Sequence, residues 1–337
     1  MNIQHLKKIA DQFQFKLTEP PEQVSAGPGG GHLCWKVKSD ELTYFIKQLD
    51  PSLDANDEKV IHRYELCESV ALRFAQQGIH AVCAIRNGEK TVIVIESNAY
   101  LVYPWIEGHT LMEISAKNAV KIAEILARIH VINLDVPELE PKWDIHTNDE
   151  IIASIEKAIS REKSLSETLR NNQATIISMN DRYLSAIPIL KEKTVVTHGD
   201  IFPHNVIWQS PDQPFLIDWE AIKKWNPTRE AVRTCAAWSG VGDNLSRLSL
   251  FEEMLKAYIN FGGSLQKNHV EASLNGIYGS TINWLLYNVD LVCSDDTSRK
   301  DNAVKQISMS IKSGLKLTEL YPTLINCINS VIDTNAS

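Results

Sequence analysis

Three side chains with oxygen donors stand at short intervals in the segment 195–220. Asp200 is followed by four residues and then by Asn205, and twelve residues separate Asn205 from Asp218. Short apolar runs flank the loop, so we expect a tight hairpin-like unit that brings the three side chains near one point. Carboxylate and amide oxygens suit a hard cation such as Mg²⁺, and the additional carboxylate can orient a nucleophile.

This spacing fits phosphoryl transfer, in which a loop Asp accepts the substrate proton while an Asn and a later Asp bind magnesium. The triplet His198-Gly199-Asp200 stands where this pattern has the loop Asp. The triplet Asp218-Trp219-Glu220 stands where it has the later Asp. HGDxxxxN followed by IDWE resembles the motifs of the aminoglycoside phosphotransferase and choline kinase superfamily, the small-molecule relatives of protein kinases. The resemblance implies that Asp200 is the catalytic base and that Asn205 and Asp218 are magnesium ligands.

Two other interpretations of the segment remain open. The acids could simply cap or pair within a loop. His198, Asp200 and His204 could also form a zinc site, but that interpretation leaves Asn205 and Asp218 without a role. His198 is expected to bond to backbone or to neighbouring carboxylates and to support the loop.

The composition limits the class of protein. The chain has 337 residues, 44% of them hydrophobic, and a net charge of -8. The length suggests about two domains, and the charge argues against a nucleic-acid partner or an anionic membrane, although it is compatible with a cationic substrate. Six cysteines lie far apart without a CxxC pair, which is typical of reduced thiols in a cytoplasmic protein. No signal peptide or membrane span is expected.

The N-terminal third contains the elements expected to bind a nucleotide. Gly29, Gly30 and Gly31 form a turn before a strand, and in kinase-like folds such a turn covers the ATP phosphates with backbone N–H groups. Lys47 lies on the next strand, over 41–49, and the resemblance implies that it contacts the α- and β-phosphates. A helix over 55–77 carries Glu65 and Glu68; we favour Glu68 as the ion-pair partner of Lys47.

A linker at about residues 103–108 follows a predicted hairpin of strands, 91–95 and 99–105. Pro104 donates no backbone hydrogen bond and Gly108 is permissive, so the segment is typical of a hinge between lobes. The resemblance implies that the adenine lies against this linker, near Tyr103 and Trp105. It predicts an N-terminal nucleotide-binding lobe over 1–106 and a catalytic and substrate-binding lobe over 107–337.

The remainder is expected to be mainly helical. Ser115 is a candidate N-cap for a helix to His130. Many relatives in the resembled superfamily carry an acid after a Gly-Asp-Pro turn, but this chain has WNPTRE over 225–230. Glu230 is expected to fill the structural role of that acid. Further helices are predicted over 248–261, 270–292 and 302–331. The side chains there that could contact a substrate are the acids Glu252, Glu253, Asp290, Asp295 and Asp296 and the aromatics Trp238, Tyr278, Trp284 and Tyr287.

The sequence therefore predicts an α+β, protein-kinase-like fold of two lobes. The smaller lobe has an antiparallel sheet plus a helix, and the larger is mainly helical. The resemblance implies ATP, with GTP as the alternative, and Mg²⁺ as cofactors for phosphorylating a hydroxyl group of a small molecule. The acceptor is an aminoglycoside, or else choline, ethanolamine, homoserine or another amino alcohol or sugar. A nucleotide-binding regulator without transferase activity is the alternative of another class. The protein is expected to be a monomer or a homodimer.

Overall fold

The computed structural model describes residues 1–25, 31–242, 244–295 and 297–335. The chain forms two compact units, one containing Met1–Glu113 and His198–Ile222, the other Ile114–Thr197 and Lys223–Ser337. The segment that carries Asp200, Asn205 and Asp218 thus belongs to the same unit as the N-terminal sheet. The division into functional lobes at residue 106 stays a prediction.

The first unit is built on a five-stranded antiparallel sheet with the order β1-β2-β3-β5-β4. Side chains on both faces of the sheet are buried, because successive residues of a strand point to opposite sides. Tyr100 and Val102 lie in one apolar cluster, whereas Ala99 and Leu101 lie in another. The strands are β1 (Glu22–Val24), β2 (Leu33–Lys38), β3 (Thr43–Gln48), β4 (Ile93–Ile95) and β5 (Asn98–Pro104).

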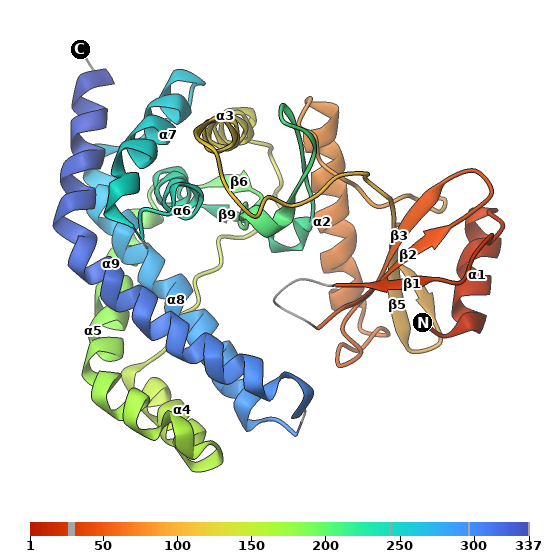
Figure 1. Ribbon diagram of the computed structural model, residues 1–337, viewed down its shortest axis with the longest axis horizontal. Coiled ribbons are helices and arrows are strands. Elements are labelled where there is room, and N and C mark those ends of the chain that lie inside the picture. The colour runs from red at the N-terminus through yellow and green to blue at the C-terminus, as the bar shows by residue number, and fades with distance from the viewer. Residues whose placement is uncertain (26–30, 243, 296, 336–337) are drawn as a thin grey trace. The chain divides into compact units, whose positions relative to one another are not determined.

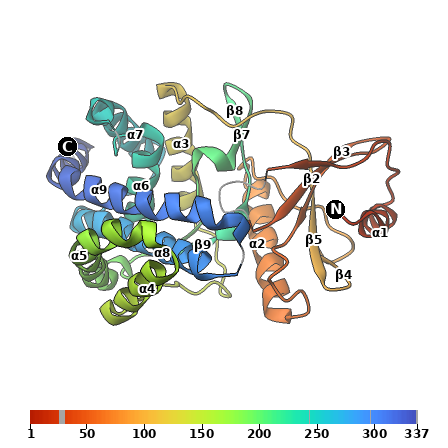
Figure 2. The ribbon, with the colours of Figure 1, turned by 60° about the horizontal axis from the view of Figure 1, so that its bottom comes forward.

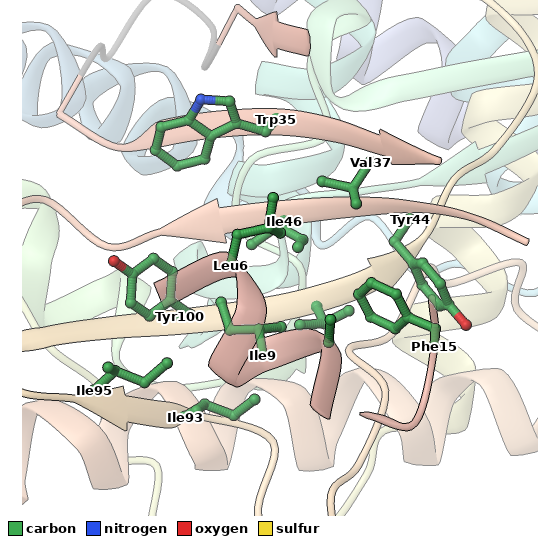
Figure 3. Close-up of a cluster of buried hydrophobic side chains, with 12 residues drawn as sticks. Leu6, Ile9, Phe15, Trp35, Val37, Tyr44, Ile46, Ile93, Ile95 and Tyr100 are labelled. Carbon is green, nitrogen blue, oxygen red and sulfur yellow. The ribbon is translucent and has the colours of Figure 1, made fainter. Parts of the chain in front are cut away.

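Helix α1 (Ile3–Phe13) packs against this sheet. Figure 3 shows Leu6 and Ile9 of the helix directed at Ile46 of β3 and at the strands beside it. Of residues 14–24, which follow this helix, only Glu22–Val24 form a strand. Helix α1 extends to Phe13, and Pro20 and Pro21 lack the N–H donors that a longer strand requires.

Helix α2 (Glu58–Gln76) confirms the helix predicted over 55–77. The side chain of Asp57 caps its first turn by accepting from the backbone N–H of Lys59 at 2.8 Å. Gly78 follows the helix with a φ of +83°, a conformation that costs little only for glycine.

The HGD and IDWE motifs each follow directly after a short strand. β7 (Val206–Ser210) and β8 (Gln213–Leu216) pair as an antiparallel hairpin, in line with the hairpin-like unit expected from the sequence. The preceding strand β6 (Val195–Thr197) pairs with β9 (Lys223–Trp225) in the second unit. The sequence HGD thus follows directly from a buried strand.

The second unit is mainly helical (Figure 1). Ser115 caps its first helix as predicted, accepting from the N–H of Asn118 at 3.2 Å. α8 packs against α5 and α9, and α5 also lies beside α4 (Figure 2). The helices are α3 (Ala116–Ile132), α4 (Asn148–Arg161), α5 (Ser166–Leu190), α6 (Pro227–Ser239), α7 (Leu248–Asn260), α8 (Val270–Cys293) and α9 (Lys300–Asn335).

Candidate active site

The ammonium group of Lys47 is buried and forms two ion pairs. Lys47 lies in β3, opposite Cys34 of β2 and Leu101 of β5, and is 7% exposed. Its Nζ donates to Oδ1 of Asp218 at 2.7 Å and to Oε2 of Glu220 at 3.0 Å. Burial lowers the pKa of Lys47, but the carboxylates of Glu220 and Asp218 raise it by more, so the pKa lies above its usual value. Lys47 is therefore charged at neutral pH.

Glu220 contacts His32 as well as Lys47. The Nδ1 atom of His32 accepts the backbone N–H of Asp50 at 3.0 Å, so the ring proton belongs on Nε2, which donates to Oε1 of Glu220 at 3.1 Å. Burial raises the pKa of Glu220, but Lys47 and His32 lower it by more, to about 2. Glu220 is thus a carboxylate that receives two donors.

His198 fixes the loop that carries Asp200. Its ring is completely buried, and its Nδ1 accepts the backbone N–H of Asp200 at 3.3 Å. Nε2 then carries the proton and donates to the carbonyl oxygen of Ile217 at 3.0 Å. Between the two, Gly199 adopts a φ of +79°, which a residue with a side chain rarely does. His198 therefore joins the Asp200 loop to the residue before Asp218, as predicted.

Asn205 adds a second connection at the same place. Its Nδ2 donates to the carbonyl oxygen of Asp200 at 3.0 Å and to the carboxylate Oδ2 of Asp200 at 2.9 Å. The carbonyl oxygen of Asn205 accepts the N–H of Ile217 at 3.0 Å. The structure thus brings the Asp200 and Asn205 side chains into contact and ties their loop to the segment that leads into Asp218.

Asp218 has a left-handed backbone conformation, with φ 62° and ψ 59°. Such a conformation is uncommon for a residue other than glycine and is found at functional sites more often than elsewhere. The neighbouring Trp219 is 1% exposed, stacks on Phe74 of α2 at 5.4 Å and lies 4.5 Å from the His198 ring. Burial of this indole between helix and loop holds the turn in which Asp218 sits.

The predicted ion pair between Lys47 and Glu68 is not the pairing that the structure shows. The carboxylate of Glu68 accepts from the Tyr103 hydroxyl at 2.6 Å and from the backbone N–H of Ala84 at 2.7 Å. Burial raises the pKa of Glu68, and these two donors only partly offset that rise. The acids of the IDWE motif reach the ammonium instead, so this expectation from the sequence was wrong for the state described here.

Glu65, the alternative partner, serves a different purpose. Its two carboxylate oxygens accept the backbone N–H groups of Thr91 and Val92 at 2.8–3.0 Å. It therefore fastens α2 to the segment that leads into β4.

Of the three glycines expected to cover the phosphates, Gly29 and Gly30 lie outside the described residues. Gly31 is described, and a Cβ atom there would collide with the carboxylate of Asp50. That carboxylate accepts from the backbone N–H and the hydroxyl of Ser52, at 2.9 and 2.7 Å, so it cannot move away freely. A Cβ atom at position 31 would fit only if the side chain of Asp50 shifted, so glycine suits this position.

At the predicted hinge, the Tyr103 hydroxyl donates its hydrogen bond to the carboxylate of Glu68. Burial first, and then the Glu68 carboxylate, raise the pKa of Tyr103 well above its usual value. The backbone N–H of Trp105 donates to the carbonyl of Thr43 at 3.0 Å, and the ammonium of Lys36 lies 4.2 Å from the centre of the indole. The side chains of Tyr103 and Trp105 thus both have partners within the protein.

The side chains near Asp218 offer oxygen atoms, which are the ligands that a magnesium ion prefers. Asp218 offers a carboxylate, and because Nδ2 of Asn205 is used on Asp200, the remaining polar atom of that amide is an oxygen. A zinc site is a poor fit, because both ring nitrogens of His198 are engaged. Within residues 1–25, 31–242, 244–295 and 297–335, no three His, Cys, Asp or Glu side chains group as a metal site.

Sequence reasoning did not assign roles to Glu220 and His32. Glu220 stands two positions beyond Asp218, and His32 directly follows the glycine turn. Two carboxylates spaced i, i+2 after a buried strand could have suggested a second acid at the site. No local pattern in the sequence points to His32.

The candidates in the helical unit differ in their exposure. Trp238 and Tyr278 are completely buried and therefore serve the core, whereas Tyr287 is 40% exposed and stacks on Trp284 at 5.3 Å. Glu252 is paired with Lys256 at 2.6 Å. Asp296 lies outside the described residues.

Glu230 is buried completely and bonds to Nε2 of His130 at 3.3 Å, and Nδ1 of His130 bonds to the Tyr258 hydroxyl at 2.7 Å. His130 is thus a packed helix-end histidine, as expected.

The sequence matches the model of the phosphotransferase enzyme family over residues 36–261. The chain belongs to this family. The match includes the lysine strand, the hinge, HGD and IDWE. The resemblance inferred from those motifs is therefore confirmed, as is the prediction of a phosphotransferase enzyme. No curated protein sequence matches the chain.

Solved structures of this family have the same fold. A spectinomycin phosphotransferase in complex with ADP and spectinomycin aligns with a TM-score of 0.70 at 14% identity, covering 94% of this chain and 98% of that one. An amicoumacin kinase in complex with AMP-PNP, Ca²⁺ and Ami gives 0.64 at 11% identity, covering 94% of both chains. Plasmodium vivax ethanolamine kinase gives 0.53 at 14% identity, covering 93% of this chain and 85% of that one.

The likeness confirms the predicted α+β, two-lobed, kinase-like fold. Among the described residues, no helix is long and apolar enough to cross a membrane.

Proposed function

We propose that the protein transfers the γ-phosphoryl group of ATP to a hydroxyl group of a small molecule in a magnesium-dependent reaction. The observation that carries the proposal is the buried Lys47 ammonium held by Asp218 and Glu220, next to the loop in which Asn205 contacts Asp200. Lysine, two aspartates and asparagine are the groups that kinase-type phosphoryl transfer requires.

Asp200 is the proposed catalytic base. Asn205 donates to its Oδ2, and His198 holds the backbone at Asp200, so the carboxylate is oriented before substrate arrives. Asp200 accepts a hydrogen bond from the acceptor hydroxyl and takes its proton late in transfer. Orientation of this kind supplies much of the rate enhancement when the protein contributes little covalent chemistry.

Lys47 is proposed to bind the α- and β-phosphates. In the structure its charge is balanced by Asp218 and Glu220, and the phosphate oxygens of a nucleotide would compete for the same donors. Asp218 and Asn205 would hold Mg²⁺, which neutralises charge on the phosphate oxygens when it is bound. Glu220 would keep the ammonium near the site during this exchange.

The nucleotide is proposed to bind to the lobe over 1–106. The turn that includes Gly31 would cover the phosphates, and the backbone of the hinge at 103–108 would contact the base. The side chains of Tyr103 and Trp105 have protein partners, which supports recognition through main-chain groups. Main-chain recognition alone leaves both ATP and GTP as donors, with ATP favoured by the family resemblance.

The acceptor is proposed to be a hydroxylated small molecule that carries an amine, either an aminoglycoside-like compound or an amino alcohol such as choline, ethanolamine or homoserine. Solved structures with the same fold act on spectinomycin, amicoumacin and ethanolamine. The net charge of -8 favours a cationic acceptor. Tyr287 is exposed and stacks on the partly buried Trp284, and a cationic group could rest on this aromatic surface.

A panel assay tests the proposal. The full chain is incubated with Mg²⁺ and either ATP or GTP, together with aminoglycosides, amino alcohols and sugars, and the products are examined by mass spectrometry. We expect one acceptor class to gain a phosphate group. Tight ATP binding without product from any acceptor would instead favour a nucleotide-binding regulator.

A further inference from the structure

A pocket lined by both polar and apolar side chains lies in the helical unit. Its volume is about 340 Å³, and α5 supplies most of its walls while α9 supplies the rest. Both helices pack along α8 (Figures 1 and 2). The lining side chains are Ala174, Thr175, Ser178, Met179, Arg182 and Thr318. All of them belong to the unit that does not contain Lys47, Asp200 or Asp218.

Two aromatic rings hold the guanidinium of Arg182 in place. Its central carbon lies 4.3 Å from the ring centre of Tyr321 and 5.3 Å from that of Tyr278. Stacking of this kind fixes the plane of the guanidinium and keeps its N–H groups pointing outward from the edge. The charge is therefore presented in one orientation.

A directional chain of hydrogen bonds sets the remaining contact of Arg182. The Thr318 hydroxyl donates its single hydrogen to the carbonyl of Gly314 at 3.0 Å, so it must accept from the Tyr278 hydroxyl at 2.9 Å. The Tyr278 oxygen in turn accepts from Nη1 of Arg182 at 3.3 Å. Nη1 of Arg182 is used in this chain, and Arg182 also donates a side-chain hydrogen bond to Tyr321. The remaining donors of the guanidinium are left for another acceptor.

Arg182 forms no ion pair with an acid among the residues that the structure describes, although Arg170 on the same helix pairs with Glu156 at 3.6 Å. The pocket lining contains no Asp or Glu, and the hydroxyls of Thr175 and Ser178 can donate. In a chain with a net charge of -8, an arginine beside a pocket without an acidic partner favours an anion.

We propose that this pocket binds the oxyanion of a small molecule, either a phosphate or a carboxylate group. The planar fork of Arg182 matches two oxygens of either group, and the hydroxyls of Thr175 and Ser178 can complete the contacts. Met179 and Ala174 offer apolar surface to the rest of the ligand. The volume of this pocket is close to the lower limit for ligand pockets, roughly 300 Å³, so the pocket suits a small metabolite. This site goes beyond the proposed transferase reaction and does not depend on it.

Calorimetric titration of the full chain tests the proposal. Inorganic phosphate and acetate serve as separate probes at constant ionic strength, after AMP-PNP and Mg²⁺ have been added to occupy any nucleotide site. We expect saturable binding of at least one probe, and the arm that responds tells whether phosphate or carboxylate is preferred. Arg182→Gln should weaken binding roughly tenfold or more, because charge-assisted hydrogen bonds are lost. Arg170→Gln, on the same helix, should change the affinity less than about twofold.

A second variant covers the case in which Arg182→Gln does not fold. Thr175→Val with Ser178→Val removes two hydroxyls and keeps the arginine with its stacking partners, and should weaken binding roughly fivefold. Lys47→Met should leave the binding of phosphate or acetate to this pocket unchanged. The proposal is overturned if neither probe binds at about 10 mM. It is also overturned if folded Arg182→Gln binds as the wild type does, or if Lys47→Met abolishes binding.

Discussion

The charge on Glu220 should contribute to the stability of the first unit, and Glu220→Gln tests this. The carboxylate accepts from Lys47 at 3.0 Å and from His32 at 3.1 Å, and its side chain is 28% exposed. Its pKa is lowered from the usual value of 4.5 to about 2, because Lys47 and His32 together outweigh the effect of burial. A shift of this size corresponds to about 3 kcal/mol, and partial exposure reduces it to about 2–3 kcal/mol.

The pH dependence follows from the direction of the shift. A group whose pKa is lower in the folded state stabilises fully above its unfolded pKa, and the contribution is lost as the pH falls toward the folded value. We therefore expect Glu220→Gln to lower the free energy of unfolding by about 2–3 kcal/mol at pH 7. At pH 3.5 this loss should be smaller than at pH 7 by about 1 kcal/mol. Urea unfolding, followed by tryptophan fluorescence in a chelating buffer without nucleotide, measures both values.

The control is Glu89→Gln, since Glu89 is exposed in the same unit. It should change the free energy of unfolding by less than about 0.5 kcal/mol at either pH. The reasoning is refuted if Glu220→Gln behaves like this control, or if it destabilises the protein equally at pH 7 and pH 3.5. Either result would mean that Glu220 does not hold Lys47 as a charged carboxylate.

Three further substitutions probe the candidate site. Lys47→Met should weaken ATP binding roughly 10- to 100-fold by calorimetry, because a buried charged donor is lost; an unchanged affinity would contradict its assignment. Asp218→Ala should raise the Mg²⁺ concentration for half-maximal activity about tenfold or more, and an unaltered metal dependence would exclude it as a ligand. Gly31→Ala should lower the free energy of unfolding by about 1–3 kcal/mol in a urea titration, because its Cβ collides with Asp50. A variant as stable as the wild type would show that Asp50 moves aside at little cost.

Features set by local spacing could be predicted from the sequence. The loop with Asp200 and Asn205 and the hairpin that precedes Asp218 follow from short apolar runs separated by turn residues. The helix over 58–76 and its terminating glycine follow from apolar periodicity and from the freedom of Gly78 at positive φ. These patterns act within a few residues, so they are readable without the fold.

Contacts between distant segments could not be predicted in the same way. Whether Lys47 contacts Glu68 or Glu220 depends on how the tertiary structure places these two carboxylates. The periodicity of the sequence does not determine this placement. Glu68 instead satisfies Tyr103 and a backbone N–H, since burying a carboxylate without donors would be costly. His32 was overlooked for the same reason, because its partner is far away in the sequence.

The central claim is that Asp200 acts on the acceptor hydroxyl in a phosphoryl transfer. It is tested most directly by measuring product formation and ATP binding for the wild type and for Asp200→Asn, with the acceptor identified in the panel. We predict that transfer falls about 10²- to 10⁴-fold while the dissociation constant for ATP changes less than about threefold. Near-full turnover by Asp200→Asn would contradict the account.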